Sequence, residues 1–84
     1  MSPELETLDL LQGGDLPLSV IRGRFTTHEA FTQGVRGLLT CGDVKLIYSG
    51  VEVPEHQWAQ HLANVGQKDG PIISLTEQGA KRIR

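Results

Sequence analysis

A pair of histidines near two glutamates is the first group in this sequence whose side chains are suited to chemistry. His56 and His61 follow Glu52 and Glu55, and imidazole and carboxylate groups are common zinc ligands. On a helix, however, residues five apart point about 140° away from each other, whereas zinc sites use pairs four residues apart on one face. The spacing therefore predicts no metal site.

The single cysteine and the glycine pair near the start both lack the setting that catalysis requires. Cys41 falls at the expected C-terminal end of a helix, where the helix dipole disfavours a thiolate nucleophile. Gly13 and Gly14 follow an expected helix, whereas a phosphate-binding glycine loop follows a strand. We therefore expect no enzyme activity, no catalytic residue and no cofactor.

The segment 27–41 has polar and apolar side chains sorted onto opposite faces of a helix. Thr26 and Glu29 have the spacing of a capping box, and Gly42 is a typical residue after a helix C-terminus. At about 100° per residue, His28 falls toward the apolar face and Thr32 at its margin. The apolar face holds Phe31, Val35, Leu38 and Leu39, and the polar face holds Glu29, Gln33, Arg36 and Thr40. This pattern predicts one buried face and one face free to bind a partner.

The order of the expected elements predicts a single α+β domain over residues 1–84. Apolar residues at helical spacing alternate with two short segments rich in β-branched residues, 44–48 and 72–75, which are typical of strands. The expected helices are 3–12, 18–25, 27–41, 55–65 and 77–83. The expected core contains Leu8, Ile21, Phe31, Val35, Leu38 and Leu75.

Length, composition and charge restrict the function further. Eighty-four residues suffice for one small core, and four aromatic residues are too few for a platform that stacks single-stranded bases. The sequence has no membrane-length apolar run and no charged-then-apolar leader, which favours a cytoplasmic protein. A net charge of −2 argues against a strongly basic nucleic-acid binder. Residues 22–45 nevertheless carry four cations against two anions.

Three segments, in order, resemble the winged helix-turn-helix family, especially the MarR-type and related small bacterial transcriptional regulators. Residues 35–44 are similar to the end of a recognition helix that turns at a glycine into the first wing strand. Residues 73–79 are similar to the family's strand-to-helix junction, and residues 16–21 resemble the entry into its second helix. The resemblance implies a three-helix core with a small two-stranded antiparallel sheet. The stretch 49–71 would then be an unusually long, partly helical wing insert.

The resemblance also implies a DNA-binding transcriptional regulator that reads the major groove with the helix at 27–41. In such a site Gln33 pairs with adenine, Glu29 accepts from cytosine, and Arg36 reaches guanine or a phosphate. Cations flanking the helix bind phosphates and position the protein without reading sequence. The implied DNA-binding residues are Thr27, His28, Thr32, Gln33, Arg36, Arg24 and Lys45.

A second interpretation is a winged-helix module that binds a protein through its acidic surface and the 49–71 insert. Its candidate interface consists of Trp58, Leu62, Glu52 and Glu55. Under either interpretation the small core favours a homodimer, because a domain of this size gains from burying more surface. The partners expected are double-stranded DNA or a protein, and no membrane.

Overall fold

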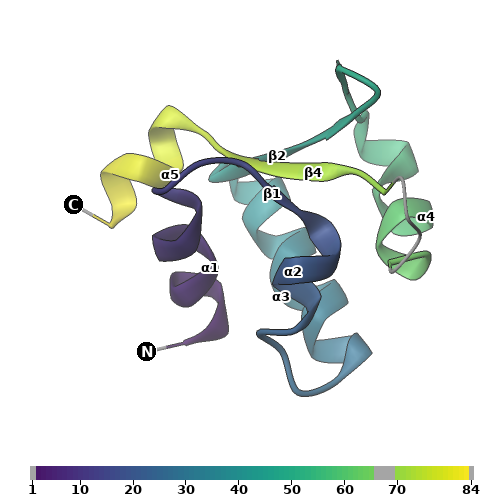
Figure 1. Cartoon of the computed structure of the whole chain (residues 1–84), viewed down its shortest axis with the longest axis horizontal. Helices are drawn as coiled ribbons and strands as arrows, with labels where there is room; N and C mark the ends of the chain where they lie inside the picture. The colour runs from purple at the N-terminus through teal and green to yellow at the C-terminus, as the bar shows by residue number, and fades with distance from the viewer. Residues whose placement is uncertain (1, 66–69, 84) are drawn as a thin grey trace.

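The computed structural model describes residues 2–65 and 70–83, which form an α+β fold with five α-helices and a four-stranded antiparallel sheet. Figure 1 shows α1, α2 and α3 on one side of the sheet, with α4 and α5 at its two ends. The helices are α1 (Pro3–Leu11), α2 (Leu18–Arg22), α3 (His28–Cys41), α4 (Trp58–Ala63) and α5 (Glu77–Arg82). The strands are β1 (Leu16–Pro17), β2 (Val44–Tyr48), β3 (Val51–Glu52) and β4 (Ile72–Leu75), and one 3-10 turn, η1 (Glu55–Gln57), precedes α4.

The sheet has the strand order β1-β4-β2-β3, so the two expected strands, β2 and β4, lie at its centre. They pair from Val44 opposite Leu75 to Ile47 opposite Ile72. The expectation of a two-stranded sheet is wrong, because two strands of two residues each are added at the edges. These strands are too short to produce a periodic signal, and Pro17 suits an edge because it has no N–H to donate.

The hairpin between β2 and β3 turns at two residues with positive φ, Ser49 at 53° and Gly50 at 79°. Positive φ at both central positions is what a tight two-residue hairpin turn requires. The chain therefore turns back at once after β2, and the insert that follows begins as a third strand in register with it. The insert helix expected at 55–65 is divided between η1 and the six-residue α4.

The core lies between the sheet and the three helices. Five of the six residues expected there are buried: Leu8, Ile21, Phe31, Val35 and Leu38. Leu75 is only half-buried, because it is the last residue of β4, where the chain leaves the sheet. None of the described helices is long and apolar enough to cross a membrane.

Helix α3 has the phase that its sequence predicts. Its buried residues are Phe31, Gly34, Val35, Leu38 and Leu39. The Thr27 hydroxyl caps the first turn by accepting from the Ala30 N–H at 3.0 Å. Gly42 ends the helix in the left-handed conformation, with φ 81°. Helix α2 is shorter than the expected 18–25, because the chain leaves the helix at Gly23 and Phe25 reaches the core from the turn before α3.

Candidate interaction surface of helix α3

The solvent-facing side of α3 is a polar stripe, which consists of Glu29, Gln33, Arg36 and Thr40. All four residues are exposed. The Gln33 amide donates to the Glu29 carboxylate at 3.4 Å, so these two side chains lie along the helix one turn apart. Among the described residues, no carboxylate forms an ion pair with Arg36. The stripe therefore presents one amide and one guanidinium to a partner, with a carboxylate at its N-terminal end.

The first turn of α3 is open to solvent. Thr27 and His28 are both exposed, and the His28 ring lies 5.9 Å from the Phe31 ring. The helical wheel places His28 toward the apolar face, but the structure leaves it outside. No earlier turn of the helix covers it, because His28 is the first helical residue.

Thr32 does not contribute to this surface. It is half-buried, and its hydroxyl oxygen is fully buried without a hydrogen-bond partner among the described residues. The Thr32 hydroxyl faces the interior, so the structure does not present this hydroxyl at the surface where the resemblance implies a DNA contact. A side chain at the border between the buried and exposed faces of a helix can point toward either face. For Thr32 the packing of the neighbouring elements determines the direction.

The cations predicted to flank α3 do not all lie beside it. Arg24 is exposed in the turn between α2 and α3, and Arg22 donates to the Phe25 carbonyl at 3.1 Å, which braces the same turn. Lys45 lies between Val44 and Leu46, which are buried toward the helices, so Lys45 projects from the opposite face of the sheet. Its assignment to the α3 surface is wrong for this reason.

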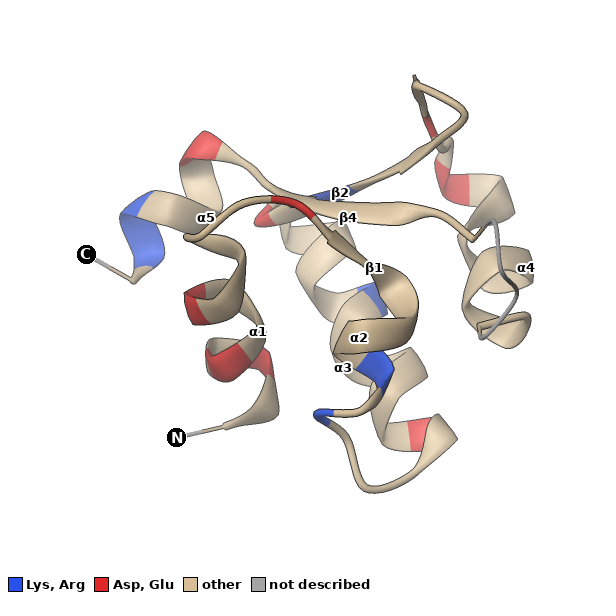
Figure 2. Cartoon of the chain, viewed as in Figure 1, with Lys and Arg blue, Asp and Glu red and all other residues tan. Residues whose placement is uncertain are grey.

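The acidic residues of α1 limit the directions from which an anion can approach. Figure 2 shows negative segments along α1 and positive ones on α2, on α3 and in the turn between them. Helices α1 and α3 pack together, and a Cβ on Gly34 would lie 3.0 Å from the Glu4 carboxylate and 2.7 Å from the Phe25 ring. Any polyanion must therefore approach α3 on the side away from α1.

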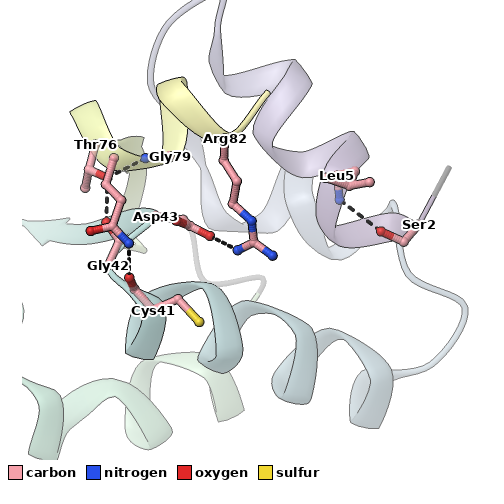
Figure 3. A network of polar contacts seen from close by, with 9 residues as sticks. Ser2, Leu5, Cys41, Gly42, Asp43, Thr76, Gly79 and Arg82 are labelled. Carbon is pink, nitrogen blue, oxygen red and sulfur yellow. Dashed lines mark hydrogen bonds and ion pairs between the residues drawn. The ribbon is translucent and has the colours of Figure 1, made fainter. Parts of the chain in front are cut away.

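The C-terminal end of α3 is held by side chains of α5 and its cap, which Figure 3 shows as one polar network. Thr76 donates to the Gly42 carbonyl and Gln78 to the Cys41 carbonyl, each at 2.5 Å. Arg82 donates to the Asp43 carboxylate, which is fully buried, and this carboxylate raises the pKa of Arg82. We call Thr76, Gln78 and Arg82 the C-terminal clamp. It fixes the helix end and the start of β2 to α5.

Sequence patterns contain little signal for this clamp. Thr76 has the pattern of a helix cap, and it does cap α5 by accepting from the Gly79 N–H at 3.1 Å. The pair Asp43 and Arg82 is separated by 39 positions, and nothing local links the two residues. The second Asp43 oxygen is buried without a hydrogen-bond partner among the described residues.

The insert forms a second candidate surface beside β2. A groove of about 290 Å³ runs past Val44, Val53, Trp58 and the acidic residues Glu52 and Glu55. The Trp58 indole N–H donates to the Val53 carbonyl at 3.1 Å, so the ring is half-buried and fixed. Leu62 is fully buried, and its assignment to a partner interface is wrong, because it anchors α4 to the core.

Comparison of the chain with protein-family models, curated proteins and solved structures finds no match. The fold and the site therefore define a class only: an α+β domain in which a central helix, clamped at one end, exposes a polar stripe.

Proposed function

We propose that this chain is a winged helix-turn-helix domain that binds double-stranded DNA with α3 in the major groove. The order α1–β1–α2–α3–β2 and the return of β4 between β1 and β2 support this fold. In it, β2 and β4 are the wing strands, and residues 49–71 form the connection between them. The observation that carries the proposal is the exposed stripe of α3 together with its open N-terminal turn, because the first turns of a recognition helix meet base edges.

Two side chains of the stripe have the chemistry for reading bases. The Gln33 amide can form two hydrogen bonds with adenine, and the Arg36 guanidinium can do so with guanine. Glu29 accepts from the amino group of cytosine, although its charge repels phosphates. Thr27 and His28 are exposed at the N-terminal end of α3, and in this proposal that end enters the groove first while the exposed Arg24 contacts a phosphate.

The small number of cations beside α3 sets the expected strength of binding. Arg24 and Arg36 are exposed there, whereas Lys45 projects from the other face of the sheet. With two phosphate contacts per subunit, the logarithm of the binding constant falls by roughly 1.8 per tenfold increase in salt for a single subunit, and by twice that for a dimer. Binding is therefore expected at low salt first.

A titration of a labelled mixed-sequence duplex at low and at physiological salt tests the proposal. Arg36→Ala and Gln33→Ala should weaken binding without changing the unfolding midpoint, by about 1–3 kcal/mol where a base contact is lost. Lys81→Ala is the matched control, because it removes one exposed positive charge from α5. An equal loss of duplex affinity in Arg36→Ala and Lys81→Ala would mean that the duplex is attracted by charge alone and not by a contact with α3. Absence of binding at low salt overturns the proposal, because the phosphate contribution is then missing.

The second candidate function is a protein-interaction module, and the groove beside Trp58 favours it. This groove combines apolar walls with two exposed carboxylates, Glu52 and Glu55, against one cation, Lys45, and this excess of negative charge suits a basic peptide. The same duplex titration distinguishes the two functions, because this module binds no DNA at low salt. Substitution of Glu55 with Lys should then abolish binding of a basic, apolar peptide and leave the unfolding midpoint unchanged.

A further inference from the structure

The face of the sheet turned away from the helices carries an exposed apolar patch. One row of paired residues crosses all four strands of this face, and it consists of Pro17, Ile72, Ile47 and Glu52. Ile72 is 42% exposed and Ile47 is half-buried, whereas the flanking residues Leu46 and Ile73 are fully buried on the opposite side. Figure 1 shows α1, α2 and α3 on that opposite side, so none of them covers the row.

Two opposite charges border the patch at neighbouring corners. Lys45 lies two residues before Ile47 on the same strand and on the same face, and Glu52 lies opposite Ile47 on β3. Both side chains are exposed. Ser74 lies opposite Lys45 on β4 and is buried. On β4 the exposed patch therefore does not extend beyond Ile72 toward Ser74.

We infer that this face is self-complementary and that a second copy of the chain docks on it. Standard sheet spacings, about 3.3 Å per residue and 4.8 Å between strands, place Lys45 and Glu52 roughly 8 Å apart. Consider a two-fold axis that is parallel to the sheet and crosses the line from Lys45 to Glu52 at its midpoint and at a right angle. This axis passes within about 2 Å of the positions of Ile47 and Ile72. Each isoleucine then meets its own copy, and Lys45 meets Glu52 of the partner subunit, twice.

Charge complementarity is the reason for choosing a second copy as the occupant. The two-fold arrangement buries the isoleucines and pairs both charges, whereas axes through Lys45 or through Glu52 put like charges together. An ion pair on a surface contributes little by itself, but like charges in contact oppose docking strongly. The charges therefore fix the register, and the apolar row supplies the attraction. This inference does not depend on DNA binding.

Sedimentation of the full 9.2 kDa chain without DNA tests the inference through charge reversal. The parent should form a species of twice this mass at micromolar concentration. Lys45→Glu and Glu52→Lys should each weaken the dimer about tenfold or more, because each creates two like-charge contacts. The double variant should restore it, because both pairs are present again with their signs exchanged. Ile72→Lys should leave only the single chain.

Thermal unfolding of each variant shows that the sheet still forms, and Lys81→Glu on α5 is the charge-matched control. A parent that stays at 9.2 kDa overturns the inference. A dimer that none of the three single variants weakens also overturns it, as does a double variant no stronger than the single ones.

Discussion

The two ends of α3 are held in different ways. At the C-terminal end, backbone carbonyls accept from Thr76 and Gln78, and the buried Asp43 is paired with Arg82. At the N-terminal end the Thr27 cap is the side-chain bond to the helix backbone, Arg22 braces the preceding turn, and Phe25 packs against Phe31 with ring centres 5.8 Å apart. The C-terminal end is fixed by bonds to a distant element, α5, whereas the bonds at the N-terminal end are local and leave Thr27, His28 and Glu29 exposed to solvent.

This difference matters for recognition. A helix anchored at one end and through its buried face keeps its orientation while its free first turn contacts a partner. The exposed side chains of that turn make only short-range contacts within α3, such as the Gln33–Glu29 bond on the surface, so a partner can reach them without separating α3 from another element. At the clamped end the backbone carbonyls of Cys41 and Gly42 are already occupied within the domain, because they accept from Gln78 and Thr76 (Figure 3).

Removing the Phe31 side chain, which packs at the N-terminal end of α3, should have the largest effect on the free energy of unfolding. Phe31 is fully buried, so Phe31→Ala should lower the free energy of unfolding by roughly 3–5 kcal/mol through lost burial and the cavity left behind. Urea unfolding followed by circular dichroism measures this change. Gln33→Ala, on the exposed face of the same helix, should stay within about 0.5 kcal/mol of the parent. Similar values for the two variants would contradict the assigned helix phase.

A methyl group inserted at the clamped end should have the next largest effect. In Gly79→Ala the new Cβ would lie 2.1 Å from the backbone carbonyl oxygen of Asp43, which cannot move aside as a side chain would. We expect a loss of about 1–3 kcal/mol, as for overpacking of a filled interior. Gly13→Ala is the control, because its Cβ meets one oxygen at an ordinary 3.7 Å. A stable Gly79→Ala variant would show that α5 is not tightly docked.

Loss of the Thr27 cap should show how much the N-terminal end of α3 contributes to the stability of the domain. Thr27→Ala removes the acceptor for the Ala30 N–H and should cost about 1 kcal/mol. Thr27→Ser keeps the acceptor and should unfold at nearly the same urea concentration as the parent. If the serine variant is as unstable as the alanine variant, the Thr27 methyl group rather than the cap stabilises this turn.

The smallest effect should be a gain in stability at the middle of the helix. A Cβ on Gly37 meets nothing within 4 Å, so Gly37→Ala should stabilise the domain by roughly 0.5–1 kcal/mol through the less flexible unfolded chain. Gly34→Ala should do the opposite, because its Cβ comes within 2.7 Å of the Phe25 ring. Thermal unfolding of the two variants side by side measures the sign of each change, and equal signs would contradict the packing of α1 and Phe25 on α3.

Local patterns in the sequence predict several features of the fold well. Strands β2 and β4 have the expected bounds, α3 has the expected faces, and Thr76 caps α5. Each of these depends on residues within about one or two helical turns or along one strand. Periodicity and capping are sufficient there, because the partners are neighbours in the sequence.

Of the candidate surface, the sequence alone determined the polar stripe of α3, because side-chain spacing on a helix follows from its geometry. The tertiary structure decided the rest. It turned Lys45 to the far side of the sheet, buried the Thr32 hydroxyl and Leu62, and brought Arg82 to Asp43 across 39 positions. These outcomes depend on which elements pack together and on which face of a sheet is covered. Contacts between distant segments, and not local propensity, determine both.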